Sequence, residues 1–74
     1  MTLKPRCSVG EHVTDRKEEV IIILEGRARV SCAGLKDLSA QAHELVYVPP
    51  ETRHDVQNAG KGTLRYLYLV TPVV

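Results

Sequence analysis

Aromatic side chains are scarce in this sequence, which contains no phenylalanine, no tryptophan and three tyrosines. A hydrophobic core in this chain must therefore be aliphatic, built from valine, isoleucine and leucine. Long apolar runs are also missing, because the longest, residues 20–24, is far shorter than the roughly 20 residues of a membrane-spanning helix. The first residues lack the apolar stretch of a secretory signal peptide. We therefore expect a cytoplasmic protein with no membrane partner.

Charge of one sign is not in excess either. The formal net charge is +1 at pH 7, and the lysines and arginines are scattered among acidic residues. Proteins that bind nucleic acid gather basic residues into a patch or stripe, so we expect no nucleic-acid partner. Hydrophobic residues make up 43% of the chain and charged residues 26%, a balance that favours a folded domain over a disordered segment.

Cysteine is limited to Cys7 and Cys32. Two cysteines are too few for the disulfide framework of a small secreted domain. In a reducing compartment we interpret both as buried free thiols, and a metal-ligand role for either is the alternative.

The chain is also short, with 74 residues, and has room for a single domain over residues 1–74. This length is near the lower limit at which one apolar core can stabilise a fold, so self-association is expected. The run EVIIIL at 19–24 has apolar residues on both faces, which suggests that one face packs inside the fold and the other against a second sheet or a partner chain. We predict a homodimer.

Short strands bounded by turn residues account for most of the chain. Runs rich in β-branched residues end at Gly26, at Pro49 and Pro50, at the glycines of residues 59–62 and at Pro72. The predicted strands are 19–24, 27–32, 45–48, 53–58 and 64–71. Residues 35–45 also fit one face of a helix, and this alternative stays open. The close spacing of the strands predicts an all-β sandwich or barrel.

Three residues of metal-binding types stand at suggestive places, namely His12, Glu19 and His54. Two imidazoles and one carboxylate suit iron or another first-row divalent ion, and zinc accepts them too. Glu19 shares strand parity with Ile21, and His54 shares it with Val56, so each could point into the fold. The alternative is that Glu19 ends a strand in solvent and that the histidines lie on the surface.

Two segments carry a family resemblance. In EHVTDRKEEVIIILEG, His12, Glu19 and Gly26 match the spacing of the first cupin motif. In HELVYVPPETRHDVQN, Pro49, His54 and Asn58 match the spacing of the second. The sequence thus resembles the small single-domain members of the cupin superfamily. The resemblance implies a cupin-type double-stranded β-helix, a jelly-roll barrel, with a divalent metal ion (Fe, Mn, Ni or Zn) held at its mouth by His12, Glu19 and His54.

The sequence departs from these motifs at named positions. Thr14 stands where the first motif has its second histidine, so one of the four usual ligands is absent. The carboxylate of Asp15, one residue on, is a possible substitute. His43 and Glu51 replace the two glycines of the second motif, and we predict from this that these turns do not need a positive φ.

Function does not follow from this resemblance, because cupins include dioxygenases, isomerases, epimerases, decarboxylases and non-enzymatic binders of sugars or effectors. One hypothesis is a metal-dependent enzyme acting on a small polar molecule, with Tyr47, Tyr66, Arg53 or Arg65 lining the mouth. A second is a small-molecule binding module without catalysis. A third is a dimeric scaffold with a solid barrel.

Overall fold

The computed structural model describes residues 1–73. Within this range the strands are β1 Thr2–Leu3, β2 His12–Val13, β3 Lys17–Glu25, β4 Arg27–Cys32, β5 Leu38–Gln41, β6 Leu45–Val48, β7 Arg53–Asn58 and β8 Leu64–Pro72. All five predicted strands are present. Residues 38–41, where a helix was the alternative, form β5.

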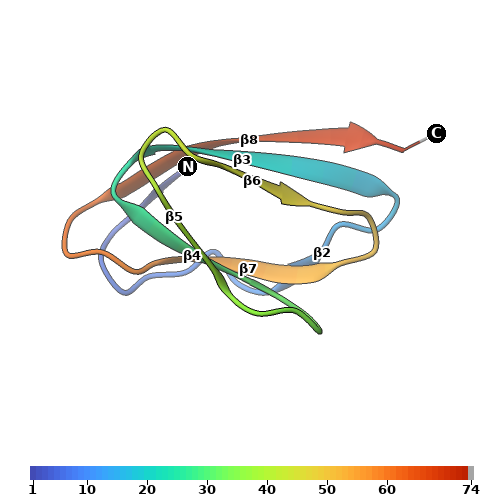
Figure 1. Ribbon diagram of the computed structural model, residues 1–74, viewed down its shortest axis with the longest axis horizontal. Coiled ribbons are helices and arrows are strands. Elements are labelled where there is room, and N and C mark those ends of the chain that lie inside the picture. The colour runs from blue at the N-terminus through green and yellow to red at the C-terminus, as the bar shows by residue number, and fades with distance from the viewer. Residues whose placement is uncertain (74) are drawn as a thin grey trace.

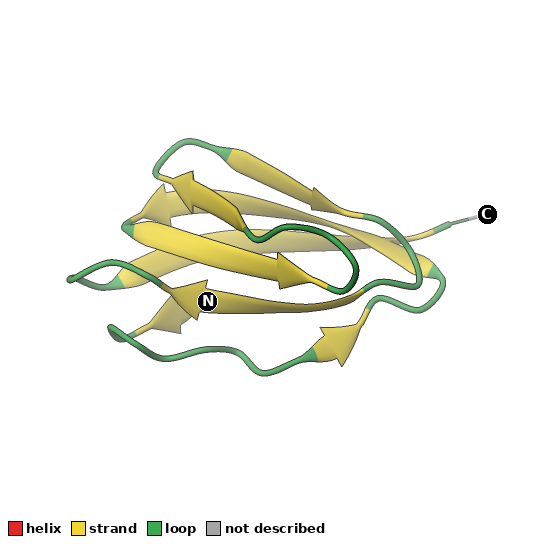
Figure 2. Cartoon of the chain, turned by 60° about the horizontal axis from the view of Figure 1, so that its bottom comes forward, coloured by secondary structure: helices red, strands yellow, loops and turns green. Residues whose placement is uncertain are grey.

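The strands form two four-stranded antiparallel sheets, with orders β1-β8-β3-β6 and β2-β7-β4-β5. Figure 1 shows the sheets facing each other, with β8, β3 and β6 above and β7 and β2 below. Figure 2, from another side, shows strands joined by loops and turns. The prediction of an all-β fold is therefore confirmed. The short β2 pairs with β7 at one edge of the second sheet, which sets His12 opposite His54.

The core between the sheets is mostly aliphatic, as the absence of phenylalanine and tryptophan predicted, and it also includes Tyr66. In β3 and β7, buried residues alternate with more exposed ones, as expected for strands with one face inward. The largest fully buried side chains are Ile21, Ile23, Leu64, His54, Val30, Val48 and Val56. Because His54 is among them, this imidazole needs polar partners within the protein.

Gly26 links β3 to β4 at a position that only glycine fits. Its φ is +88°, and a Cβ atom there would lie 2.5 Å from the carbonyl oxygen of Thr63. Both the left-handed conformation and the close approach of another backbone exclude a side chain. The glycine of the first motif therefore serves the fold.

Two turns overturn a prediction made from the missing glycines. His43 has φ 74° and Glu51 has φ 55°, so both residues adopt the left-handed conformation that we expected these turns to avoid. The turns are held by backbone hydrogen bonds, from the His43 N–H to the Ile23 carbonyl at 2.8 Å and from the Glu51 N–H to the Asp15 carbonyl at 2.7 Å. The left-handed conformation costs roughly 1 kcal/mol or more at each of these two turns, a cost that glycine would avoid.

The two cysteines are free thiols in different environments. Cys32 is buried in the core, whereas Cys7 is exposed, so the prediction of burial is wrong for Cys7. Burial raises the pKa of the Cys32 thiol, and the nearby Asp37 carboxylate adds to this effect. Neither thiol is part of the histidine cluster described below.

Among residues 1–73 there is no helix long and apolar enough to cross a membrane.

Candidate metal centre

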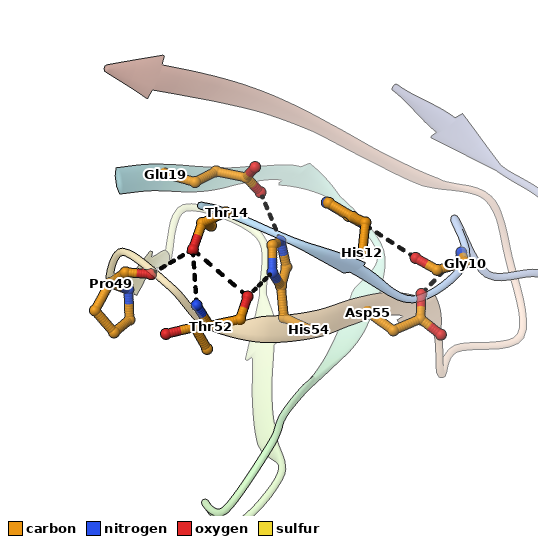
Figure 3. A network of polar contacts seen from close by, with 8 residues as sticks. All are labelled: Gly10, His12, Thr14, Glu19, Pro49, Thr52, His54 and Asp55. Carbon is orange, nitrogen blue, oxygen red and sulfur yellow. Dashed lines mark hydrogen bonds and ion pairs between the residues drawn. The ribbon is translucent and has the colours of Figure 1, made fainter. Parts of the chain in front are cut away.

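Three side chains from three strands converge at one end of the fold. His12 on β2 and His54 on β7 are direct cross-strand partners, and Glu19 comes from β3 in the opposite sheet. One potential ligand atom from each lies within 4.8 Å of the others. Figure 3 shows Glu19 and His12 approaching His54 from different sides. The structure therefore brings together the three residues singled out in the sequence, with Glu19 and His54 buried and His12 exposed.

The tautomer of His54 is fixed by the backbone. Its Nδ1 lies 3.1 Å from the carbonyl oxygen of Thr52, and a carbonyl can only accept a hydrogen bond. Nδ1 therefore carries the hydrogen and donates it. The other ring nitrogen, Nε2, is left with a lone pair when the imidazole is neutral.

His12 is oriented in the same manner. Its Nδ1 donates to the carbonyl oxygen of Gly10 at 3.0 Å, and the N–H of Gly10 donates in turn to Oδ1 of Asp55 at 3.0 Å. The rings of His12 and His54 are tilted by 58°, with centroids 4.1 Å apart. Both imidazoles thus use Nδ1 on a backbone carbonyl and keep Nε2 free, which is the arrangement usual for histidine ligands of metals.

The Nε2 atom of His54 is buried and has no hydrogen-bond partner within the part of the chain that the structure describes. Its nearest charged neighbour is Oε2 of Glu19, at 3.5 Å. A neutral Nε2 and an ionised carboxylate both present lone pairs, so a cation held between them would be coordinated by both. Two ligands at roughly 2.0–2.2 Å from one ion are at most about 4.4 Å apart, and the spacing between His54 and Glu19 falls within this limit.

Thr14, which replaces the family's second histidine, has a structural role. Its buried hydroxyl donates to the Pro49 carbonyl at 2.8 Å and accepts from the Thr52 N–H at 2.9 Å. The same Thr52 supplies the carbonyl that orients His54. Figure 3 shows this chain of contacts from Thr14 through Thr52 to His54. Thr14 therefore acts on the site through a neighbouring backbone.

Asp15 does not take the place of the missing ligand. It is exposed, with φ 57°, in the turn between β2 and β3, and the cluster among the described residues does not include it. His43 is likewise exposed and outside the cluster.

A pocket of about 370 Å³ opens beside the cluster. His12 and Glu19 form part of its wall, and the other lining residues are Met1, Val9, Gly10, Glu11, Val56, Tyr66 and Tyr68. Burial raises the pKa of Tyr66 to about 12, and the Glu19 carboxylate is the next cause. The phenol of Tyr66 is therefore neutral throughout the physiological range.

Sequence analysis identified only some of the residues that line this pocket. Tyr66 lines the pocket as suggested, and its neighbour Tyr68 was missed. Tyr47 is exposed elsewhere, where its hydroxyl donates to Glu18 at 2.8 Å. Arg53 and Arg65 do not line the pocket.

Both arginines are exposed and paired with acids. Arg53 contacts Glu11 at 2.9 Å, and Arg65 lies 3.6 Å from Glu25. Exposed pairs of this kind contribute little to stability.

Asn58, the last residue of the second motif, is also structural. Its buried amide donates to the carbonyls of Leu3 and Gly62 at 2.9 and 2.8 Å, and its oxygen accepts from the Gly60 N–H at 2.9 Å. These contacts fasten β1 and the loop before β8 to the end of β7. The asparagine therefore maintains the fold away from the cluster.

The chain belongs to the cupin family, because a family model described as "Cupin domain" matches residues 1–70. No curated protein matches it. Among solved structures, it is similar to a predicted oxalate decarboxylase from Thermotoga maritima, with 26% identity and a TM-score of 0.89, covering 97% of this chain and 62% of that one.

Two further structures share the fold. A protein from Thermus thermophilus is 22% identical, with a TM-score of 0.88, covering 96% of this chain and 67% of that one. The cupin domain of Schizosaccharomyces pombe Cnp3 is 15% identical, with a TM-score of 0.90, covering 97% of this chain and 52% of that one. The chain thus spans between half and two thirds of the length of these proteins.

Proposed function

We propose that this cupin domain binds one first-row divalent metal ion through His12, Glu19 and His54, and that the open coordination positions face a small-molecule pocket. The observation that carries the proposal is the buried Nε2 of His54, which has no hydrogen-bond partner among residues 1–73 and stands 3.5 Å from the Glu19 carboxylate. A bound cation satisfies both groups, since it accepts the nitrogen lone pair and neutralises the carboxylate.

The donor set narrows the class of ion. Two imidazole nitrogens and a carboxylate oxygen suit iron, manganese, nickel or zinc. Since the cluster includes no thiolate, it has no special preference for soft ions. His12 is exposed and lies on the two-residue β2, so it is the ligand whose ring can adjust most readily toward the other two.

The supporting residues are arranged to hold these ligands in place. The Thr52 carbonyl fixes His54, and the Gly10 carbonyl fixes His12. Three protein ligands leave positions for exogenous molecules, and a metal ion at such a site can polarise an oxygen donor of the bound molecule.

The pocket supports a small, uncharged polar molecule as the ligand. Val9 and Val56 supply apolar wall, and Tyr66 and Tyr68 supply neutral aromatic wall. Within the described residues, no lysine or arginine side chain lines the pocket, whereas Glu11 and Glu19 do.

Metal content of untagged protein tests the proposal, measured on wild type and on His54→Ala. The matched control is His43→Asn, because His43 is exposed and asparagine tolerates its left-handed backbone. We expect near-stoichiometric metal in wild type and in His43→Asn and almost none in His54→Ala. Equal metal content in all three proteins would contradict the ligand assignment.

A binding module that holds its ligand without metal is the second candidate. The hydroxyl of Thr14, at the position of the missing histidine, is occupied by backbone partners, and so the cluster has three ligands where the family usually has four. Protein that stays metal-free after incubation with iron, manganese, nickel and zinc in turn would favour this second function.

A further inference from the structure

The second sheet presents arginine side chains on its outer face. Along β4, Ala28 and Val30 are buried in the core, whereas Arg27 and Arg29 are exposed. Because successive residues of a strand point to opposite faces, the two arginines project away from the core. Figure 1 shows β4 crossing β7, its neighbour in this sheet.

A row of polar side chains crosses this outer face at Arg29. Strand register sets Gln57 of β7 beside Arg29, and an isolated bridge sets Ser8 on the other side of Gln57. A hollow of about 450 Å³ lies here, lined by Arg6, Ser8, Arg29 and residues 57–60. We call it the basic hollow.

The charged side chains of this hollow are all of one sign. Arg6 and Arg29 line it, and no aspartate or glutamate among residues 1–73 does. Neither arginine forms an ion pair within the described chain, whereas Arg53 and Arg65 each pair with a glutamate. The pocket beside the metal centre has the opposite character, because glutamates line it and, among the described residues, no lysine or arginine does.

We propose that the basic hollow binds the phosphate group of a small phosphorylated molecule. The planar guanidinium groups of Arg6 and Arg29 can each donate two hydrogen bonds to phosphate oxygens. The Ser8 hydroxyl and the Gln57 amide add neutral donors in the same wall. The volume of about 450 Å³ lies within the range of small-molecule sites, roughly 300–1,000 Å³, so there is room for the organic part that carries the phosphate.

Backbone hydrogen bonds hold one wall of the basic hollow in place. The Cys7 carbonyl accepts from the Asn58 N–H at 2.9 Å, and the Val9 N–H donates to the Val56 carbonyl at 3.0 Å. The segment that contains Ser8 is therefore fastened along β7 before a ligand arrives. A wall that is already ordered reduces the entropy lost on binding.

The basic hollow and the metal centre lie on opposite faces of β7. Val56 lines the pocket beside the metal centre, and its neighbour Gln57 lines the basic hollow. Phosphate binding can therefore be tested independently of the metal ion.

Titration of ¹⁵N-labelled protein with glycerol phosphate, followed by NMR, tests the proposal at about pH 7, where a phosphate monoester carries close to two negative charges. We expect saturable shifts of the backbone amide signals of Arg6, Arg29 and Gln57, and none with sodium chloride at the same ionic strength. Arg29→Gln should weaken binding about 10-fold or more, because it removes charge-assisted hydrogen bonds. Arg6→Asn should do the same, and asparagine tolerates the left-handed backbone there, with φ 65°.

Arg27→Gln is the matched control. Arg27 lies on the same strand and the same face as Arg29, and its replacement removes the same charge, but it does not line the basic hollow. This variant should bind within about 2-fold of wild type, because salt screens an exposed charge that does not contact the ligand. The dispersion of the same spectra shows that each variant is folded.

Three results would overturn the proposal. Wild-type protein without saturable shifts would exclude the site. An equal loss of affinity in Arg27→Gln and Arg29→Gln would show a general attraction of anions to a basic surface. Binding of inorganic phosphate without binding of glycerol phosphate would exclude a phosphorylated molecule as the ligand.

Discussion

The hydroxyl of Thr14 accepts a hydrogen bond from the N–H of Thr52 at 2.9 Å, and it joins the turn after β2 to the loop after β6. This contact lies directly behind the cluster, because the Thr52 carbonyl accepts the Nδ1–H of His54. A residue at a ligand position of the family thus contributes to the site by fixing the backbone that orients a ligand.

Replacing Thr14 tests this role. Thr14→Val keeps the shape but removes the hydroxyl, leaving the Thr52 N–H and the Pro49 carbonyl without their partner. We expect a loss of about 1–3 kcal/mol in the free energy of unfolding, measured by urea denaturation. Thr14→Ser retains the hydroxyl and should lose much less. Equal stability of the valine and serine variants would show that the hydroxyl is not important.

Asp55 is expected to affect metal binding although it is not a ligand. Its carboxylate accepts from the Gly10 N–H, and the Gly10 carbonyl orients His12. Asp55→Ala should lower metal affinity about 10-fold, as loss of a supporting contact usually does. Competition with a chelator of known affinity measures this change. Gln57→Ala on the same strand is the control and should bind as wild type does, and an unchanged affinity in Asp55→Ala would refute this supporting role.

Gly26 and Gly34 form a matched pair for testing backbone crowding. Both have positive φ, but a Cβ at Gly26 meets the Thr63 carbonyl at 2.5 Å, whereas a Cβ at Gly34 meets nothing within 4 Å. Gly34→Ala should cost about 1 kcal/mol from conformational strain alone. Gly26→Ala should cost several times more. Thermal or urea unfolding measures how much stability each variant loses. Equal losses would mean that conformational strain alone matters at both positions.

Alkaline stability should depend on Tyr66. Burial raises its folded-state pKa to about 12, whereas an unfolded tyrosine titrates near 10. Below about pH 10 the phenol is neutral in both states and the stability is fully present. Between about pH 10 and 12 only the unfolded state ionises, so stability falls by up to about 3 kcal/mol.

Tyr66→Phe provides the comparison for this pH effect. Its free energy of unfolding should decline less than that of wild type between pH 10 and 12, because the phenylalanine has no proton to lose. Identical pH profiles for the two proteins would mean that Tyr66 is not the group responsible.

Five strands could be predicted because the information that determines them is local, whereas the two-residue strands β1 and β2 were not predicted. Gly26, Pro49, Pro50 and Pro72 mark where strands end, and β-branched runs fill the space between them. Turn conformations were harder, since His43 and Glu51 adopt a positive φ that their residue types disfavour. Hydrogen bonds to distant backbone impose that conformation, and they cannot be seen in the local sequence.

The candidate site also combines features that the sequence predicts with features that only distant contacts determine. His12, Glu19 and His54 were recognisable by residue type and motif spacing, but the tautomers of the two histidines were not. The backbone carbonyls of Gly10 and Thr52 fix those tautomers, and the sequence does not show that these carbonyls lie beside the two rings. Tyr68 was missed because strand parity alone does not indicate how far a pocket extends along β8.

The most direct measurement of the central claim is an anomalous difference map from a crystal of the wild-type protein grown with zinc, with data collected on both sides of the zinc absorption edge. We predict one strong peak at about 2.0–2.2 Å from Nε2 of His12, Nε2 of His54 and a carboxylate oxygen of Glu19. A map with no peak among these three side chains, or with zinc bound only elsewhere on the molecule, would contradict the account.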